Sequence, residues 1–123
     1  AAACNTIETH VRGTTPIGVF PAGDTPEGLS DMTGNSWDWT INLAGRSLDH
    51  IAFGYPYRAD DGREDTAAGP EMIRVARGGG WCYGREHVVT TMRYTLYPDA
   101  RNYNLGVRLA CGDAEGIHAA TQR

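Results

Sequence analysis

Two acidic residues flank a Gly-Asn turn just before an apolar run, in the segment Asp31-Met32-Thr33-Gly34-Asn35-Ser36-Trp37-Asp38-Trp39-Thr40. Calcium prefers about six to eight oxygen ligands, and carboxylate and backbone oxygens converge where a chain bends sharply. Asp31 and Asp38 therefore suit a hard cation. Acids that only cap a turn or face solvent on a strand would give the same pattern, so both interpretations remain open.

A cluster of glycines follows later in the chain, in the segment Arg77-Gly78-Gly79-Gly80-Trp81. Glycines let a backbone pass close to a bulky group, and the indole gives that group something to pack on. The spacing is not that of a phosphate-binding loop. The cluster is therefore interpreted as a close approach within the fold.

The cysteines give little support for metal or redox chemistry. Cys4, Cys82 and Cys111 include no Cys-x-x-Cys pair, so neither a zinc ribbon nor a thioredoxin-type site is indicated. Cys82 and His87 are close enough in sequence to form a nucleophile pair, but no third orienting group is identifiable. A reducing, cytoplasmic location is the simplest interpretation, and one disulfide between Cys4 and Cys111 remains open.

Four tyrosines lie close together, at Tyr83, Tyr94, Tyr97 and Tyr103. Tyrosine supplies a large amphipathic contact area at low entropic cost, as in antibody binding sites. The cluster favours ligand binding. The alternative is a structural loop whose rings pack on the three tryptophans.

Composition excludes several classes of protein. The 123 residues favour one domain, and 16 glycines with 6 prolines predict a loop-rich fold. We see no secretion signal, and no apolar run reaches the roughly 18 residues of a membrane span. A net charge of −4 argues against nucleic-acid binding. The basic residues are all arginine, which suits bidentate pairing with carboxylates but also fits a GC-rich genome or a hot habitat.

The hydrophobic pattern predicts short strands at 17–20, 36–42, 73–76 and 105–109. In the second of these, Trp37, Trp39 and Ile41 should share one buried face. Residues 43–70 should form a long polar loop, 85–93 an irregular or helical turn, and 112–123 a frayed tail.

These motifs, taken in order, resemble the formylglycine-generating-enzyme/sulfatase-modifying family, a branch of the C-type-lectin-like fold. The matching segments are 5–8, 14–21, 28–40, 61–65, 74–81 and 104–109. The resemblance implies an α+β fold with short strands and many loops. Relatives usually carry an N-terminal half that we do not find here. Residues 1–123 are therefore expected to be the C-terminal portion of one domain, whose partner is that missing half, possibly a separate chain.

The resemblance also implies structural calcium. One site would use the side chains of Asp31 and Asp38 with the carbonyl groups of Gly34 and Ser36. A second, weaker site would use Asn5, the carbonyl groups of Thr6 and Val11, and the nearby acid Glu8.

Two enzymatic branches of the family fit poorly. The oxidase branch binds copper with two cysteines shortly after the glycine motif, whereas here His87 stands where the second cysteine is expected after Cys82. The ergothioneine-synthase branch has a similar spacing, but its iron lies on a separate helical domain that we do not find. This chain alone would supply one wall of such an iron site.

A third branch fits better, the variable proteins of diversity-generating retroelements. In that branch some positions stay fixed between the variable ones, and the residues that match them here are Trp81, Arg93, Pro98-Asp99, Arg101 and Gly106-Val107-Arg108. Eleven residues between these points are of types that an AAC codon reaches by changing adenines only: Cys82, Tyr83, Gly84, Thr91, Tyr94, Thr95, Leu96, Tyr97, Asn102, Tyr103 and Asn104. The resemblance implies a non-enzymatic protein that binds an unknown protein or surface ligand through residues 82–104. A divergent oxidase and a fixed interaction module of a signalling protein are the alternatives.

Overall fold

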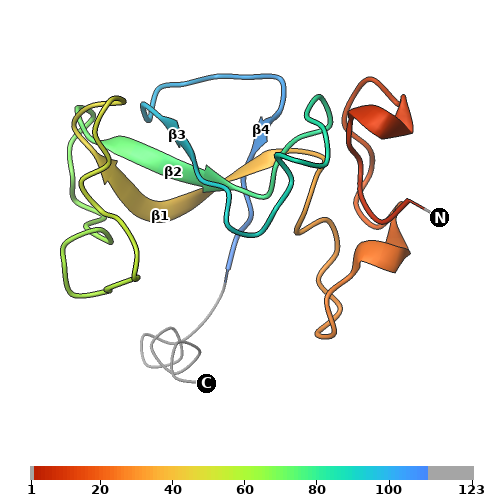
Figure 1. Ribbon diagram of the computed structural model, residues 1–123, viewed down its shortest axis with the longest axis horizontal. Helices are drawn as coiled ribbons and strands as arrows, with labels where there is room; N and C mark the ends of the chain where they lie inside the picture. The colour runs from red at the N-terminus through yellow and green to blue at the C-terminus, as the bar shows by residue number, and fades with distance from the viewer. Residues whose placement is uncertain (1, 111–123) are drawn as a thin grey trace.

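The computed structural model describes residues 2–110 and is built around one small mixed sheet (Figure 1). Its strands are β1 (Trp37–Gly45), β2 (Ile73–Arg77), β3 (Tyr94–Leu96) and β4 (Leu105–Gly106). They lie in the order β3-β2-β1-β4, with β4 parallel to β1 and the other neighbours antiparallel. Two short 3-10 turns, η1 (Ile7–Thr9) and η2 (Pro21–Gly23), precede the sheet. The low content of regular structure agrees with the prediction from composition.

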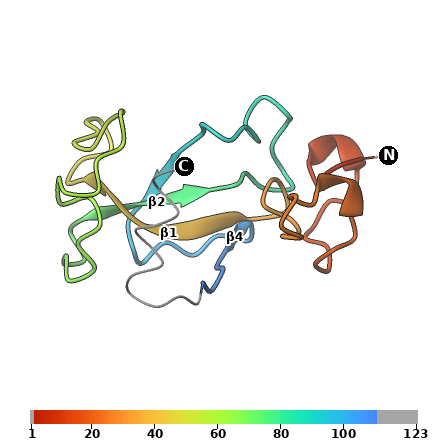
Figure 2. The same ribbon diagram turned by 90° about the horizontal axis from the view of Figure 1, so that it is seen from below.

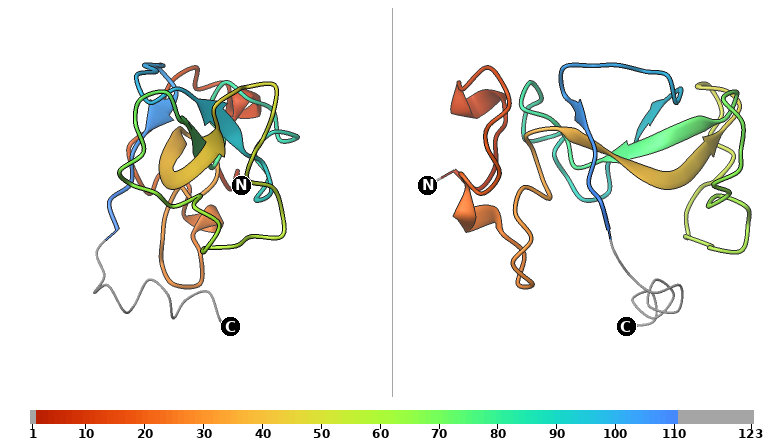
Figure 3. Two further views of the ribbon diagram at one scale, coloured as in Figure 1. Left: turned by 90° about the vertical axis from the view of Figure 1, so that its left-hand side faces the viewer. Right: turned by 180° about the vertical axis from the view of Figure 1, so that it is seen from behind.

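The chain on either side of β1 and β2 extends the molecule beyond the sheet. The N-terminal segment lies past one end of the sheet, and the loop of residues 46–70 lies past the other (Figures 1 and 2). Seen from behind, the chain leaving β3 passes over the sheet to reach β4 on the far side of β1 (Figure 3).

The register shifts along β1, which explains why its predicted alternation fails. Trp37 is only 2% exposed, but Ile41 is 49% exposed and Trp39 is half-buried. The pairing with β2 shifts between Trp39 and Leu43, where the Thr40 hydroxyl donates to the Val75 carbonyl at 2.8 Å. Beyond the shift, Leu43 returns to the core, so the strand runs to Gly45 instead of ending at residue 42.

The strand predicted at residues 17–20 is wrong. This stretch forms a turn before η2, and Ile17 is 80% exposed. Gly18 has a φ of 81°, which a strand does not allow, and the flanking Pro16 and Pro21 cannot donate to a sheet.

The last strand is shorter than predicted. β4 ends at Gly106, and both Val107 and Leu109 lie exposed on the surface, Leu109 at 96%. β3 was not predicted as a strand. Residues 84–91 form successive turns, in agreement with the irregular segment expected there. The predicted tail at 112–123 and Cys111 lie outside the described residues.

The core is small, and its buried apolar residues belong to β1 and β2. The fully buried apolar residues are Trp37, Leu43, Ala44, Ile73, Val75 and Ala76. Buried polar groups extend this core toward the N-terminal segment. The Asn5 amide donates to Gly13 O at 2.8 Å and to Asn35 Oδ1 at 3.2 Å, and Asn35 Nδ2 donates to Thr15 O. These bonds fasten the N-terminal segment to the turn that precedes β1.

The described residues contain no helix long and apolar enough to cross a bilayer.

Candidate functional site

The two motifs identified from the sequence meet in the fold. Gly34 N donates to Gly78 O at 2.7 Å, and Trp81 N donates to Asn35 O at 2.9 Å. A Cβ placed on Gly80 would lie 3.4 Å from the indole Cδ1 of Trp37. The glycine cluster therefore passes along the Gly-Asn turn and against the buried tryptophan, which is the close approach that its composition predicted.

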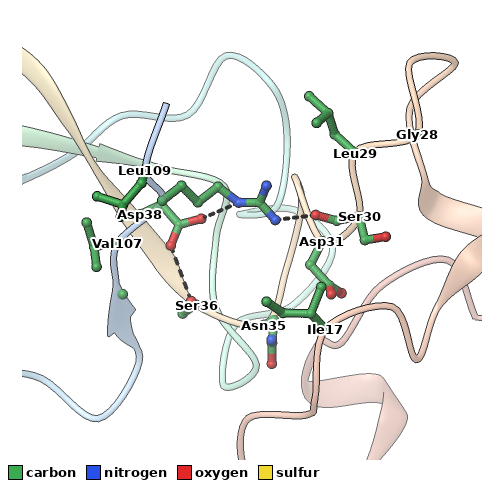
Figure 4. A pocket seen from close by; sticks show the side chains of 12 residues that line it. Ile17, Gly28, Leu29, Ser30, Asp31, Asn35, Ser36, Asp38, Val107 and Leu109 are labelled. Atoms are coloured by element: carbon green, nitrogen blue, oxygen red, sulfur yellow. Dashed lines mark hydrogen bonds and ion pairs between the residues drawn. The ribbon is translucent and has the colours of Figure 1, made fainter. Parts of the chain in front are cut away.

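The acidic residues of the first motif line one cavity of about 490 Å³ (Figure 4). Asp31 reaches it from the loop before β1, and Asp38 reaches it from β1 itself. Asp31 Oδ2 accepts a hydrogen bond from Gly18 N at 2.9 Å. Apolar side chains form much of the remaining wall, among them the exposed Leu109.

Arg108 crosses this cavity from the chain after β4. Its Nε donates to Asp38 Oδ2 at 3.1 Å, and its other end donates to the Ser30 carbonyl (Figure 4). Burial raises the pKa of Asp38, although the Arg108 charge opposes this effect, and the Asp31 carboxylate raises the pKa a little further. The two carboxylates therefore repel each other weakly, in a cavity where one cation is already supplied by the chain.

The side chains of the first predicted calcium site share one cavity, but its Gly34 carbonyl already accepts a hydrogen bond from Ser36 N at 2.9 Å. Asp31, Ser36 and Asp38 line the same cavity, and Gly34 lies in the turn between the two acids. A Cβ on Gly106 would lie 2.7 Å from Ser36 Oγ and 3.0 Å from Asp38 Oδ1, so glycine leaves this space open. Arg108 is the group with which a bound cation would have to compete for Asp38.

The donors of the second predicted site are already engaged in hydrogen bonds or exposed, and this site stays a prediction. Asn5 Oδ1 accepts a bond from the Thr9 hydroxyl at 2.9 Å, and the Thr6 carbonyl accepts two bonds from Thr9. Glu8 instead accepts from Arg85 N at 3.1 Å, and Val11 is exposed. The Asn5 and Thr6 oxygens thus serve the N-terminal turn, and within residues 2–110 no group of three acidic, histidine or cysteine side chains is gathered to hold a metal.

The predicted ligand-binding tyrosines divide into two pairs. The rings of Tyr83 and Tyr94 pack on buried Trp37, with centroids 5.5 and 5.0 Å away. Burial raises the pKa of Tyr83. Tyr97 and Tyr103 face outward, with exposures of 42% and 76%. The first pair therefore anchors the segment, and the second pair is free to contact another molecule.

Cys82 and Asn104 lie at the base of this segment. Asn104 Nδ2 lies 3.3 Å from Cys82 Sγ, and Asn104 O accepts from Trp37 N at 2.8 Å. Asn104 is thus buried, unlike the other predicted variable residues. The Tyr103 ring packs at a tilt beside Trp81, with the two ring centres 5.6 Å apart, and the nearby Cys82 thiol raises the Tyr103 pKa.

The remaining predicted variable residues range from exposed to half-buried. Thr91 and Asn102 are exposed, whereas Gly84, Thr95 and Leu96 are half-buried on or next to the sheet. Cys82 and Tyr83 are also half-buried. Only part of the segment 82–104 therefore forms an outward surface.

The proposed nucleophile pair of Cys82 and His87 finds no support in the geometry. His87 Nδ1 lies 3.0 Å from Glu86 Oε1, and the imidazole ring stacks near Tyr83. No hydrogen bond joins Cys82 to His87 in the described part of the chain. Cys4 and Cys82 are both free thiols there.

The aromatic residues of the 46–70 loop had no predicted role. Arg63 is buried, binds Asp61 through two nitrogen atoms and stacks 4.5 Å over the Tyr57 ring. Tyr55 lies beside the guanidinium groups of Arg77 and Arg93. A Tyr-Pro-Tyr triplet in a loop rich in arginine was the available signal.

Comparison with known proteins assigns this chain to a family. Residues 2–112 match the sulfatase-modifying factor enzyme 1-like domain. Over 110 residues the chain is 29% identical to hercynine oxygenase of Mycolicibacterium smegmatis, covering 89% of this chain and 25% of that protein. It is 30% identical over 112 residues to the inactive C-alpha-formylglycine-generating enzyme 2 of Bos taurus, covering 85% and 29%.

A third relative is a protein kinase. The chain is 30% identical over 99 residues to serine/threonine-protein kinase pkn1 of Chlamydia caviae, covering 80% of this chain and 15% of the kinase. The chain thus spans less than a third of the length of each of these relatives. The match over residues 2–112 shows that this chain belongs to the family of sulfatase-modifying factor enzyme 1-like domains.

Proposed function

We propose that this chain is the ligand-recognition portion of a C-type-lectin-like domain, and that it binds a protein or surface ligand through the outward side of residues 82–104. The observation that carries the proposal is the division of the tyrosines. Tyr83 and Tyr94 are held on buried Trp37, while Tyr97 and Tyr103 remain exposed. A fixed base with free phenol rings is the arrangement that aromatic binding surfaces use.

The thiols support recognition over oxidation by this chain alone. Copper chemistry of the oxidase type needs two neighbouring thiolates. The Cys82 thiol accepts a hydrogen bond from Asn104 Nδ2. The turns that follow contain His87 and Val88 and no second cysteine. In the described residues the other thiol is Cys4, which lies in the N-terminal segment.

We further propose that the segment is diversified by a retroelement. Substitution is then expected at the outward residues, because changes there leave the core intact. Those residues are Thr91, Tyr97, Asn102 and Tyr103. Asn104 and Tyr94 should vary less, because Asn104 is buried and Tyr94 packs on Trp37.

Sequencing near-identical copies of the gene and their surroundings tests this proposal. A reverse transcriptase gene, a near-identical template repeat and adenine-directed changes at the four outward positions are expected. Identical residues at Tyr97 and Tyr103 in all copies, with no template repeat, would reject diversification. In that case the protein could still bind a ligand, but as a fixed interaction module.

Whether these tyrosine rings are structural or free to bind is tested by substitution. Tyr97→Ala should leave the melting temperature nearly unchanged, and Tyr103→Ala should lower it only slightly, because the exposed Tyr103 ring contacts Trp81 at the surface. Tyr94→Ala should lower it most, because Tyr94 packs on buried Trp37. A large loss of thermal stability in Tyr97→Ala would show that this ring is structural and would remove the basis for a free binding surface.

We propose that calcium ties this scaffold together through Asp31 and Asp38, with the carbonyl groups of Gly34 and Ser36. The fit of the carboxylates to one cavity supports this assignment. Bound calcium would neutralise the two acids and fix the turn before β1. Calorimetric titration should detect calcium binding that Asp31→Asn abolishes, and an unchanged affinity in that variant would exclude the site.

A second candidate function is a part of an oxygenase. It is favoured by the likeness to hercynine oxygenase, and by the Cys82 thiol lying against Tyr103 and Asn104. In this case the chain would supply one wall of a larger site. Iron-dependent oxygen consumption by the purified protein with hercynine would favour catalysis, and its absence together with ligand binding would favour recognition.

A further inference from the structure

Two arginines of the sheet region converge on one tyrosine without an acidic partner. The guanidinium carbons of Arg77 and Arg93 lie 5.9 and 5.7 Å from the centre of the Tyr55 ring. Arg77 comes from the end of β2, Arg93 from just before β3, and Tyr55 from the loop of residues 46–70. Three separate segments thus bring two cations and a phenol together.

Neither cation is neutralised by the described residues. The ion pairs found there join Arg46 to Glu71, Arg63 to Asp61, and Arg108 to Asp38, besides a His87–Glu86 contact. Arg77 and Arg93 are nevertheless half-buried. Burial lowers the pKa of Arg93, and the neighbouring charges on Arg77 and Arg63 lower it further. In a chain with a net charge of −4, this is a concentrated positive group.

The hydrogen bonds orient these cations and still leave donors free. Arg77 Nη1 donates to the carbonyl groups of Thr90 and Met92, and Arg93 Nη1 donates to Phe53 O at 2.7 Å. The other guanidinium nitrogens of Arg93 have no hydrogen-bond partner in residues 2–110. The Tyr55 hydroxyl accepts from Arg77 Nη2, so its own hydrogen can point to another acceptor.

We propose that Arg77, Arg93 and Tyr55 form a binding site for the oxyanion of a ligand, a carboxylate or a phosphate group. Planar guanidinium groups match both kinds of anion, and an anion would relieve the repulsion between the two cations. Tyr55 is 60% exposed, so the site is open to solvent. Tyr55 and Arg77 lie outside residues 82–104, and Arg93 lies within them but is not one of the outward residues of the tyrosine surface. The site therefore does not depend on that surface.

Titration of the full chain with inorganic phosphate and, separately, with acetate tests the site. Ionic strength is held constant with chloride, and the arginine Nε–H signals are followed by NMR. We expect saturable shifts at Arg77 and Arg93. Tighter binding of phosphate would identify a phosphoryl ligand, and tighter binding of acetate would identify a carboxylate ligand.

Matched variants separate this site from general charge. Arg93→Gln and Tyr55→Phe should each weaken binding, by about tenfold for the loss of one charge-assisted bond in Arg93→Gln. Arg58→Gln removes the same charge from an exposed position and should bind as the wild type does. If Arg93→Gln fails to fold, Tyr55→Phe decides, because it keeps the ring and removes only the hydroxyl.

Two results would overturn the proposal. One is the absence of saturable shifts with both anions. The other is an equal loss of affinity in Arg58→Gln and in Arg93→Gln, or, if Arg93→Gln does not fold, an unchanged affinity in Tyr55→Phe, because either would mean that only the overall charge of the chain attracts the anion.

Discussion

At the scale of single residues, two tryptophans of one strand have different roles. Trp37 is 2% exposed and carries Tyr83 and Tyr94 on its faces, whereas Trp39 is half-buried beside the register shift. The sequence placed both on one buried face. It could not show the shift, because pairing with β2 depends on where Thr40 bonds across the sheet.

Trp37→Ala should therefore cost more than Trp39→Ala. Removing a buried tryptophan typically costs about 3 to 5 kcal/mol. The loss for Trp39 should be clearly smaller, because much of its ring already contacts water. Urea unfolding of both variants measures the difference, with Ile41→Ala as a control at an exposed position of β1. Equal losses at both tryptophans would contradict this ranking.

Asp38 gives a pH-dependent prediction for the protein in excess chelator. Its folded pKa is raised above the ordinary value of 3.8, mainly by burial. The folded state therefore binds the proton more tightly than the unfolded state does. The contribution of Asp38 to stability should fall as pH rises from 3.8 through the raised folded pKa.

Asp38→Asn isolates this contribution, because Glu8 and Asp61 have lowered pKa values and act in the opposite direction. The unfolding free energy of wild type minus that of Asp38→Asn should decrease with rising pH across this window. Denaturant unfolding at closely spaced pH values measures it. A difference that increases with pH would show that Arg108 outweighs burial.

At the scale of elements, the turn before β1 depends on glycine for two separate reasons. Gly34 has a φ of 79°, which most side chains avoid, and a Cβ there would lie 2.6 Å from Asn5 O. Gly28 has nearly the same φ, 82°, but a Cβ there would meet nothing within 4 Å. Comparing these two glycines therefore separates the cost of the backbone conformation from the cost of steric overlap.

Gly34→Ala should therefore destabilise the protein more than Gly28→Ala. The left-handed conformation alone costs roughly 1 to 2 kcal/mol for alanine, and this cost applies to both variants. Only Gly34→Ala also pushes the N-terminal segment away from the turn. Thermal unfolding compares the two, and similar melting temperatures would mean that the contact with Asn5 yields easily.

The elements that sequence reasoning located are those whose apolar residues alternate with polar ones. Ile73–Arg77 and the start of β1 were predicted because Ile73 and Val75, like Trp37 and Trp39, alternate with polar residues. β3 was missed because its three residues are strand only through pairing with Arg74, Val75 and Ala76. Residues 17–20 were wrongly predicted as a strand because they are mostly apolar. Gly18 turns the chain there, and Ile17 and Val19 are exposed to solvent.

The candidate site was predictable in its residue types and less so in its geometry. The acids Asp31 and Asp38 do share a cavity, as a turn between them suggested. The partner of Arg108 was not predicted, and it is Asp38, because parallel pairing brings Gly106 beside Asp38. The Tyr55 group could not be foreseen, since its members lie on segments that meet only in the folded sheet.

At the scale of the whole molecule, the cavity of Asp31 joins parts of the chain that the sheet does not hold. Asp31 is bonded to Gly18 of the N-terminal segment, Asp38 belongs to β1, and Arg108 follows β4. The sheet pairs β4 with β1 through only two residue pairs. A ligand bound to both acids would therefore connect the N-terminal segment to the sheet.

Calcium should raise the melting temperature of the whole domain if it binds at these acids, because a ligand that binds only the folded state stabilises it by mass action. Asp31→Asn should abolish the increase. Arg108→Gln should enlarge it, because Asp38 would then have no competing cation. Magnesium serves as the control, since its smaller octahedral shell suits this open cavity less well. An equal increase with magnesium, or one that persists in Asp31→Asn, would place the bound cation elsewhere, and the connection between the N-terminal segment and β1 would then rest on hydrogen bonds such as those of Asn5 with Asn35 and of Gly18 with Asp31.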